Sequence, residues 1–237
     1  YLFSSKIDFP KDENNISNFF DYHFSYGPFF KTVLQNNNIK IKKIIDIKIP
    51  FLKKNNFKKV KLYDACILGY DPYIYNLNTT WDNQILTELS ILNILQKLNY
   101  KNVVLKIKMG AKKKKDSQKK SIYIYKKMFK KIYKKSLDLS FDIKEGEFSK
   151  ILEESKLVIG GLSTAYLESC FYNVPYYIFE PEKNGIYNLD MILPKSNVIR
   201  LEKNLVSNLR EKNWKRIDVK ELFTGKELSK INFKKYI

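Results

Sequence analysis

The segment Lys156–Glu180, KLVIGGLSTAYLESCFYNVPYYIFE, constrains the fold more than any other part of the chain. Leu157–Ile159 is a short apolar run, typical of a buried strand, and a Gly-Gly pair follows it. Ser163 and Thr164 come next, and short hydroxyl side chains of this kind are preferred where a helix begins. The segment therefore predicts a strand, a tight glycine turn and a helix in direct succession.

The same segment predicts a second strand and an anion site. Asn173 marks a turn after the helix, and Pro175–Phe179 is another apolar run, which ends at an acidic residue. A glycine turn that leads into a helix leaves several backbone N–H groups unpaired at one spot, and the helix dipole favours negative charge there. We therefore expect a phosphate site built from the backbone at Gly161 and from the hydroxyls of Ser163 and Thr164.

Strand and helix patterns alternate along the rest of the chain. The expected strands are Ala65–Leu68, Val103–Ile107, Leu137–Phe141 and Asn197–Leu201, and the expected helices are Asp82–Leu98, Ser121–Lys134, Glu147–Ser155 and Glu202–Asn213. Such alternation favours βαβ units with right-handed crossovers, and hence an α/β fold with a doubly wound parallel sheet. Ligands of these sheets bind beyond the carboxyl ends of the strands, which is where the glycine turn is expected.

Two of these helices carry more detailed expectations. Asp82 is the expected N-cap of the first helix, on which one apolar stripe is expected, formed by Ile85, Leu89, Leu92 and Leu95. In the helix over residues 121–134, the Tyr and Met side chains are expected on the side that faces the core.

Changes in composition divide the chain into three expected parts. Residues 1–58 are polar and aromatic, with a short helix expected at Pro28–Gln35 and a β-rich segment at Ile39–Ile49, and we interpret them as a partial amino-terminal region and linker. Residues 59–213 are expected to form the Rossmann-like domain, and residues 214–237 a helical tail. The sequence does not begin with Met, which is typical of a piece of a longer protein.

The charge of the chain suits anionic partners, but a biased overall composition is the alternative. Lysines are spread along the chain beside many Asn and Ile residues, and they are dense only over Lys112–Lys115 and Lys126–Lys135. A total of 44 Lys and Arg residues against 25 Asp and Glu residues gives a formal net charge of +19, which suits nucleic acid, a phosphorylated substrate or an anionic membrane surface. No nucleic-acid-binding motif accompanies this charge, so nucleic acid is not the expected partner. No membrane-spanning run or signal peptide is recognisable, and we expect a cytoplasmic protein that can sit peripherally at the inner face of the cell membrane.

Cysteine and histidine are too few for a metal site to be expected. Cys66 and Cys170 lie inside apolar patterns, which predicts buried free thiols in a reduced compartment. Besides these the chain has one histidine, His23, so we expect no bound metal. His23 is a candidate general base, because His titrates near neutral pH.

The run ILEESKLVIGGLSTAYLESCFYNVPYYIFE resembles the carboxy-terminal nucleotide-binding domain of GT-B-fold glycosyltransferases. In that family a short helix and a strand lead to a Ser/Thr phosphate turn, which a Leu-Glu-Ala helix and a Gly-x-Pro turn follow. Here Leu167-Glu168-Ser169 and Asn173-Val174-Pro175 stand in these places, and Asn is, after Gly, the residue best suited to a left-handed turn. The resemblance covers about residues 60–200 in layout and about residues 148–181 in motif.

The resemblance implies roles for several residues. Ser163 and Thr164 would hold the phosphates of the donor, and Glu168 would bind its ribose hydroxyls. Retaining members of the fold carry a second acid eight positions before that Glu, where this chain has Gly160, so the resemblance implies an inverting enzyme. Inverting bacterial members that build surface carbohydrate have a Lys-x-His-Pro pattern after the second strand; this chain has no His there, and Lys108 is the expected cation near the phosphate.

Two further segments border the expected site. Gly69 and Tyr70 close the first strand of the domain, and we expect them to contact the donor or the acceptor. Glu180 closes the strand after the phosphate turn and is a candidate ligand of the ribose or the sugar. A simple turn at Gly69 and a solvated acidic loop after Glu180 are the alternatives.

The function implied by the resemblance is inverting, metal-independent transfer of a sugar from a nucleotide-sugar donor to a surface glycan or lipid-linked oligosaccharide, without a cofactor. Two other kinds of protein remain open. One is a related enzyme of the same fold, such as a glycerophosphotransferase or a nucleotide-sugar 2-epimerase, although the chain has few acidic and His residues for the epimerase. The other is a non-catalytic module, derived from a transferase, that binds a glycan, a nucleotide or a partner protein.

Overall fold

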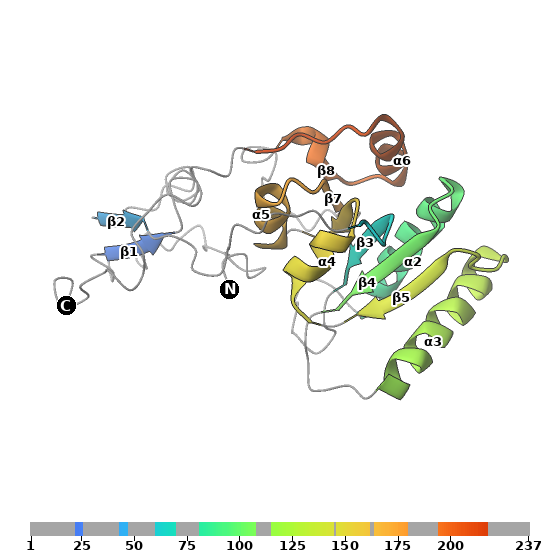
Figure 1. Cartoon of the computed structure of the whole chain (residues 1–237). Helices are drawn as coiled ribbons and strands as arrows, with labels where there is room; N and C mark the ends of the chain where they lie inside the picture. Colours follow the sequence, from blue (N-terminus) through green and yellow to red (C-terminus); the bar gives the residue numbers. More distant parts are fainter. Residues whose placement is uncertain are drawn as a thin grey trace, which may run out of the picture. The chain divides into compact units, whose positions relative to one another are not determined.

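The computed structural model of the chain describes residues 22–25, 43–46, 60–69, 81–107, 115–144, 146–161, 164–179 and 194–217 (Figure 1).

Contacts between residues divide the chain into two compact units, and residues 57–216 belong to one of them. The other unit contains a parallel pair of short strands, β1 (Tyr22–Ser25) and β2 (Lys43–Asp46). β2 confirms a strand within the β-rich segment expected at Ile39–Ile49, whereas the helix expected at Pro28–Gln35 lies outside the described residues.

The larger unit is built on one sheet in which every neighbouring pair of strands is parallel. Its strands are β3 (Ala65–Leu68), β4 (Asn102–Lys106), β5 (Ser140–Lys144), β6 (Val158–Gly160), β7 (Tyr176–Phe179) and β8 (Val198–Ile199). Their order is β5-β4-β3-β6-β7-β8, so the chain builds outward from β3, returns beside it at β6 and then builds in the opposite direction. The predicted doubly wound parallel sheet of Rossmann type is confirmed.

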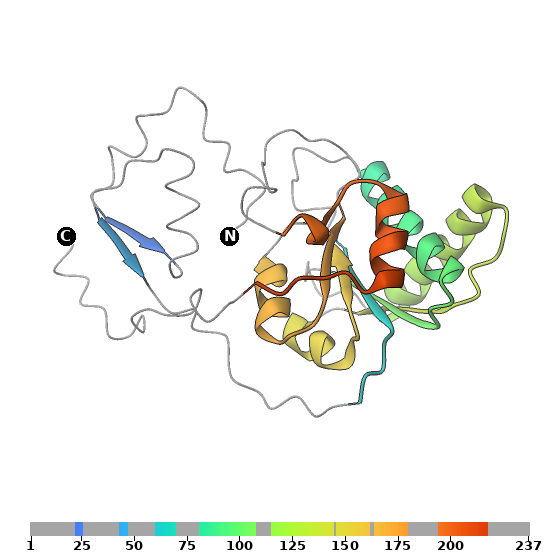
Figure 2. The same ribbon diagram turned by 90° about the horizontal axis from the view of Figure 1, so that it is seen from above.

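Helices cover both faces of this sheet (Figure 2). They are α2 (Trp81–Lys97), α3 (Lys115–Tyr133), α4 (Phe148–Glu154), α5 (Thr164–Phe171) and α6 (Glu202–Glu211), and a short 3-10 turn, η3 (Lys195–Asn197), precedes β8. α2, α3 and α6 lie on one face and α4 and α5 on the other, because a right-handed crossover changes face when the chain reverses its direction along the sheet. No helix in the described part of the chain is both long and apolar enough to cross a lipid bilayer.

The main core lies between the sheet and the layer formed by α2, α3 and α6. Alternate strand residues contribute to it, among them Ile67, Leu105 and Ile159, and they meet Leu92 of α2 and Phe129 of α3. Each of these side chains is at most 1% exposed. Since helices cover both faces, the strands are apolar on both sides, which explains their continuous apolar runs in the sequence.

α2 begins at Trp81, so Asp82 lies within its first turn and the N-cap prediction is wrong. An acidic residue in the first turn still suits the positive end of the helix dipole. The expected apolar stripe is buried, but Ile91 and Ile94, which lie off that stripe, are buried as well. α2 contacts α3 and α6 in addition to covering the sheet, and this leaves it little exposed surface.

α3 begins at Lys115 and not at Ser121. The prediction missed the start because the first turn is polar and has no apolar periodicity that a sequence pattern can detect. Met128 and Tyr125 pack against the core as expected. The expectation is wrong for Tyr123, whose side chain is 66% exposed.

β5 begins at Ser140, so the strand expected over Leu137–Phe141 is shifted. Leu137 and Leu139 are buried and give the segment a strand-like alternation. Before Ser140, however, the backbone bonds to a side chain, because Gln96 donates to the carbonyl of Ser136 at 3.0 Å and accepts from the N–H of Asp138 at 2.8 Å. The other strands and helices of the sheet domain begin and end within about two residues of expectation.

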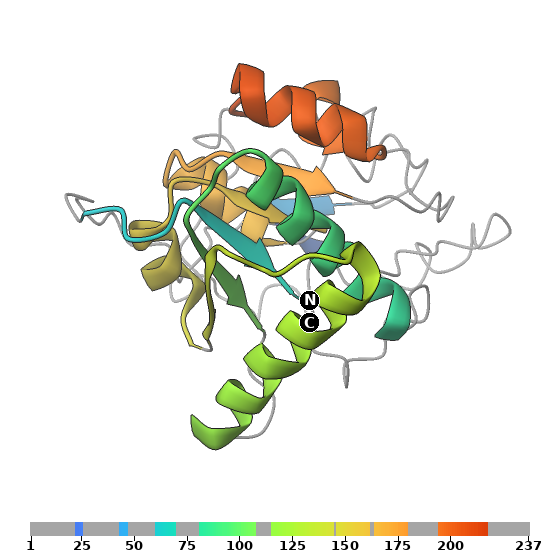
Figure 3. The ribbon, with the colours of Figure 1, turned by 90° about the vertical axis from the view of Figure 1, so that its right-hand side faces the viewer.

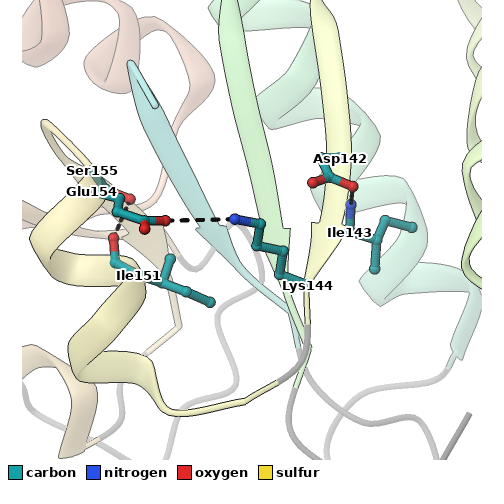
Figure 4. A network of polar contacts seen from close by, with 6 residues as sticks. All are labelled: Asp142, Ile143, Lys144, Ile151, Glu154 and Ser155. Atoms are coloured by element: carbon teal, nitrogen blue, oxygen red, sulfur yellow. Dashed lines mark hydrogen bonds and ion pairs between the residues drawn. The ribbon is translucent and has the colours of Figure 1, made fainter. Parts of the chain in front are cut away.

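α4 is fastened to the edge of the sheet by an ion pair (Figure 4). Lys144, which ends β5, lies with Nζ 3.5 Å from Oε2 of Glu154, which ends α4, and 4.8 Å from the centre of the Tyr63 ring. The pKa of Lys144 is raised, and its hydrogen bond to Tyr63 contributes more to this than its interaction with Glu154 does. Ser155 then ends the helix, and its Oγ donates to the carbonyl of Ile151 at 2.7 Å. These contacts fix the level at which the chain enters β6.

One buried side chain, Asn197, joins three parts of the larger unit. Its Nδ2 donates to the hydroxyl of Tyr166 on α5 at 2.7 Å and to the carbonyl of Lys215 after α6 at 2.6 Å. Its Oδ1 accepts from the backbone N–H of Lys215 at 2.9 Å. Asn197 is fully buried, and its bond to Tyr166, which forms away from water, holds α5 against the end of the sheet, whereas the bonds to Lys215 are only partly buried.

We expect Asn197→Ala to lower the free energy of unfolding by about 2–4 kcal/mol, because it leaves the Tyr166 hydroxyl and the Lys215 backbone without their buried partner. Urea unfolding followed by circular dichroism measures the change. Asn213→Ala is the matched control, since Asn213 is exposed and should change stability by less than about 0.5 kcal/mol. Equal stabilities of the two variants would contradict the assignment.

Candidate functional site

The carboxyl edge of the sheet has its switch point between β3 and β6, where the strand order reverses. Leu68, the last residue of β3, lies opposite Gly160, the last residue of β6, and on its other side opposite Lys106 of β4. After β3 the chain continues along the sheet toward β4, and after β6 it continues in the opposite direction, toward β7. In open parallel sheets such a switch point is the usual place for a ligand.

A side chain has no room at Gly160. A Cβ atom there would lie 2.7 Å from Cβ of Leu68 and 2.8 Å from the hydroxyl of Tyr176, both far inside normal contact distance. Gly69, just after β3, is similarly confined, with Oε1 of Glu88 at 2.8 Å from a Cβ in that position. Both glycines are buried, and glycine is a packing requirement at Gly160, where Cβ of Leu68 cannot move aside, whereas at Gly69 the end of the Glu88 side chain can shift.

The glycine turn after β6 is held in place by Tyr176 of β7. The Tyr176 hydroxyl donates to the carbonyl of Gly161 at 2.7 Å, and the Tyr176 ring meets the Tyr166 ring edge-on with centroids 5.6 Å apart. α5 begins shortly afterwards, at Thr164, with its N-terminal end at the carboxyl edge of the sheet. The backbone thus has the strand, turn and helix that the sequence predicts, and the first turn of the helix can receive an anion.

Glu168 lies one turn into α5, beyond Thr164. Burial raises the pKa of its carboxyl group to about 7, although the positive charge of Lys106 acts in the opposite direction. A carboxyl group with this pKa changes its charge close to neutral pH, which is typical of groups in functional sites.

The sequence pattern predicts Lys108 as the cation near the phosphate and does not single out Lys106, which the structure places at the end of β4. Its side chain is 5% exposed, and its Nζ donates to the carbonyl of Ile107 at 2.5 Å. Leu105 belongs to the core under α2, so Lys106 lies on the other face of β4, the face that α4 and α5 cover. A lysine as the last residue of an apolar strand was the available signal, because burial of lysine is rare unless its charge is compensated.

A second acidic residue, Glu153 of α4, lies near Glu168 and is 8% exposed. Burial raises the pKa of Tyr172, and the charges of Glu168 and then Glu153 raise it further, so both carboxyl groups lie within electrostatic reach of Tyr172. Burial lowers the pKa of Lys61, whereas Glu153 raises it. The α4–α5 side of the sheet therefore holds several ionisable groups, of which Lys61, Glu153 and Tyr172 lie toward the amino ends of the strands.

The structure brings some of the predicted site residues together. Gly69 and Gly161 follow neighbouring strands at the switch point, and Glu168 lies on the helix that begins there. Ser163, Tyr70, Lys108 and Glu180 lie outside the described residues, as do the side chains of Thr164 and His23. The backbone of His23 belongs to β1, in the smaller unit.

Neither metal binding nor reactive thiols are evident in the described residues. No group of three or more His, Cys, Asp or Glu side chains among them is placed to bind a metal ion. Cys66 and Cys170 are free and buried, as predicted. Burial raises the pKa of Cys66 to about 12, so this thiol is chemically inert near neutral pH.

Two solved structures are similar to this chain. It overlaps 56% of the UDP-GlcNAc 2-epimerase of Methanocaldococcus jannaschii, crystallised with UDP-GlcNAc and UDP, over 83% of its own length, with 16% identity and a TM-score of 0.47. It overlaps 37% of TarM over 84% of its own length, with 18% identity and a TM-score of 0.43. The chain thus spans well under two thirds of either protein.

No family model matches the sequence, and no curated protein matches it. The strand order and register, rather than the overlaps, define the fold. The doubly wound parallel sheet is the one that the resemblance to the carboxy-terminal domain of GT-B glycosyltransferases implies.

We expect Gly160→Ala to lower the free energy of unfolding by about 1–3 kcal/mol, because the added methyl group overlaps Leu68 and the Tyr176 hydroxyl. Amide NMR should show shifts at Gly69 and Gly161, since β3 and β6 must move apart. Gly146→Ala is the contrasting variant: its φ of 116° makes alanine strained, but no atom lies within 4 Å. That variant should lose stability without shifts at the switch point; wild-type stability of Gly160→Ala would contradict the packing argument.

Glu168 should make stability depend on pH. Its pKa in the folded chain, about 7, lies above the ordinary value of 4.5, so the folded state holds the proton more tightly and the stabilisation is lost as pH rises through 7. Between pH 4.5 and pH 8, the unfolding free energy of the wild type should fall by about 3 kcal/mol relative to that of Glu168→Gln.

Urea unfolding at a series of pH values measures this difference. Glu211→Gln, at an exposed carboxylate, is the control and should follow the wild type at every pH. A constant difference between wild type and Glu168→Gln would show that the carboxyl group is not perturbed.

Proposed function

We propose that the chain binds a nucleotide-sugar donor at the switch point between β3 and β6 and catalyses metal-independent, inverting transfer of the sugar. One observation supports this proposal: Gly69 and Gly161 follow neighbouring strands where the strand order reverses, α5 begins at Thr164, and Glu168 lies one turn further along α5. The start of α5 would then meet the phosphates of the nucleotide, and Glu168, one turn further on, would meet its ribose.

The phosphates of the donor would bind at the start of α5. Backbone N–H groups of a first helical turn point toward an anion, and the helix dipole adds a favourable field. In our proposal Ser163 and Thr164 add hydroxyl donors, and Lys108 adds a positive charge. When the bond to the sugar breaks, negative charge grows on the leaving phosphate, and donors fixed in advance stabilise it without reorganisation.

Glu168 would accept hydrogen bonds from the two ribose hydroxyls. The ionised carboxylate is the better acceptor for this purpose, so donor binding should favour loss of the proton that burial favours in the free chain. Lys106 supports the ionised form, because its charge opposes the effect of burial on the pKa of Glu168. Donor affinity should therefore rise with pH through 7.

The confined Gly160 supports an inverting mechanism. Retaining members of the resembling family have an acid at this position, and here Leu68 and Tyr176 occupy the space that any side chain would need. In an inverting reaction the acceptor hydroxyl attacks the anomeric carbon directly as a base removes its proton. His23 is our candidate for this base, and a surface glycan or lipid-linked oligosaccharide is our candidate acceptor.

Calorimetric titration with UDP-, GDP-, CMP- and CDP-linked sugars tests the proposal. We expect one class of donor to bind, and Ser163→Ala and Glu168→Ala to weaken binding at least about tenfold, because each removes donor or acceptor groups from the nucleotide. Between pH 6 and pH 8 the affinity of the wild type should rise about tenfold, since a group with a pKa near 7 must lose its proton on binding.

Ser207→Ala is the matched control, because Ser207 lies on α6 and bonds only to nearby Glu211 in the described structure. It should bind the donor as the wild type does. Failure of the folded wild type to bind any of these donors would exclude the transferase and favour a non-catalytic module.

A further inference from the structure

One side of α3 is firmly attached to the domain. Phe129 is fully buried, and its ring lies 4.9 Å from that of Tyr133. The hydroxyl of Tyr125 donates to the carboxylate of Glu88 on α2, and the Tyr125 ring lies 5.5 Å from that of Phe141 on β5. The orientation of the helix about its own axis is therefore fixed, and its other side is presented outward.

The outward side of α3 is strongly basic. From Lys119 to Lys134 the sequence has seven lysines and neither Asp nor Glu. All seven are exposed, and in the described structure none of them forms an ion pair; they are Lys119, Lys120, Lys126, Lys127, Lys130, Lys131 and Lys134. Lys135 differs, because its Nζ lies 5.9 Å from the centre of the Phe129 ring.

Three exposed apolar side chains lie among these lysines, and one of them, Ile132, is 41% exposed. Tyr123 is 66% exposed and Ile124 is 51% exposed. With 3.6 residues per turn, Tyr123 falls in line with Lys127, Lys130 and Lys134 along the helix. Lysine stems and an aromatic ring on one face give a surface with both positive charge and apolar area.

α3 also lies at the margin of the domain. It packs beside β5, the edge strand, and the two views show no other described helix or strand over its far side (Figures 1 and 3). The basic face is thus open along more than three turns, long enough to lie flat on an extended partner.

We propose that the outward face of α3, residues 119–134, binds the surface of an anionic lipid membrane. Positive charge without acidic neighbours complements anionic headgroups, with about a fivefold gain in affinity per lysine near the surface. The Tyr123 ring can enter the interfacial layer, where amphipathic aromatic side chains are stable, and Ile124 adds buried apolar area.

The composition of the face favours lipid over nucleic acid. Bidentate phosphate and base recognition is a property of arginine, and residues 119–134 contain none. An aliphatic side chain such as Ile124 gains free energy in a lipid interface but offers a base neither stacking nor hydrogen bonds. This inference does not depend on the transferase proposal, since neither the donor nor the switch point enters it.

Vesicle co-sedimentation of the full chain tests the inference. We expect binding to phosphatidylcholine vesicles that contain about 30% phosphatidylserine, none to pure phosphatidylcholine, and loss of binding as salt is raised. The triple variant Lys127→Glu/Lys130→Glu/Lys134→Glu should bind at least about 100-fold more weakly, because it reverses three charges of the basic face.

The matched control reverses three exposed lysines elsewhere, in Lys101→Glu/Lys203→Glu/Lys215→Glu, and thus has the same net charge. It should bind within about threefold of the wild type, with circular dichroism showing that both variants are folded. A third variant, Tyr123→Ser/Ile124→Ser, keeps every charge and should weaken vesicle binding several-fold while leaving binding to a single-stranded RNA unchanged.

Three results would overturn the inference. The first is no binding of the wild type to anionic vesicles at low salt, and the second is an equal loss of vesicle binding in the two charge-reversed variants. The third is vesicle binding that Tyr123→Ser/Ile124→Ser leaves unchanged, together with tighter binding of the wild type to the RNA than to the vesicles. The last result would identify a nucleic-acid surface.

Discussion

The contact between β3 and β6 at the point where the strand order reverses determines most of what this domain presents at its carboxyl edge. Leu68 and the Tyr176 hydroxyl occupy the space beside Gly160, so the last residue of β6 can carry no side chain. The same hydroxyl then bonds to Gly161 and directs the chain toward the start of α5. One close approach of two strands thus sets both the shape of the turn and the place where the helix dipole begins.

The buried charges beside this contact are not what stability alone would favour. A well-packed apolar side chain in place of a buried lysine or glutamate is often equally stable or more stable, because taking a charge out of water costs several kcal/mol. Lys106, Glu153 and Glu168 nevertheless lie on the α4–α5 side of the sheet. Lys106 ends β4 at the carboxyl edge and its charge acts on Glu168, a pairing that is typical of sites for binding or chemistry. Glu153 lies toward the amino ends of the strands, and the opposite face also buries one carboxyl group, that of Glu88.

Much of this fold could be predicted from the sequence, because strands buried on both faces and helices with one apolar side leave strong periodic patterns. The details that failed depend on tertiary partners. The start of β5 is set by the side chain of Gln96, far away in the sequence. The importance of Lys106 becomes visible only when α5 covers its face of β4. α3 has aromatic residues on more than one side, so periodicity could not show that Tyr125 faces inward and Tyr123 outward.

The two surfaces singled out in the larger unit are far enough apart to act independently. α3 packs beside β5, and β4 and β3 lie between β5 and β6, which places the basic face at least three strand spacings, about 14 Å, from the glycine turn. At physiological salt this exceeds the distance over which exposed charges influence one another. The lysines of α3 therefore contribute little to holding a phosphate at α5, which agrees with the separate role proposed for them. A surface that positions the chain and an edge that binds a ligand can then be altered separately by mutation, which allows each to be tested without disturbing the other.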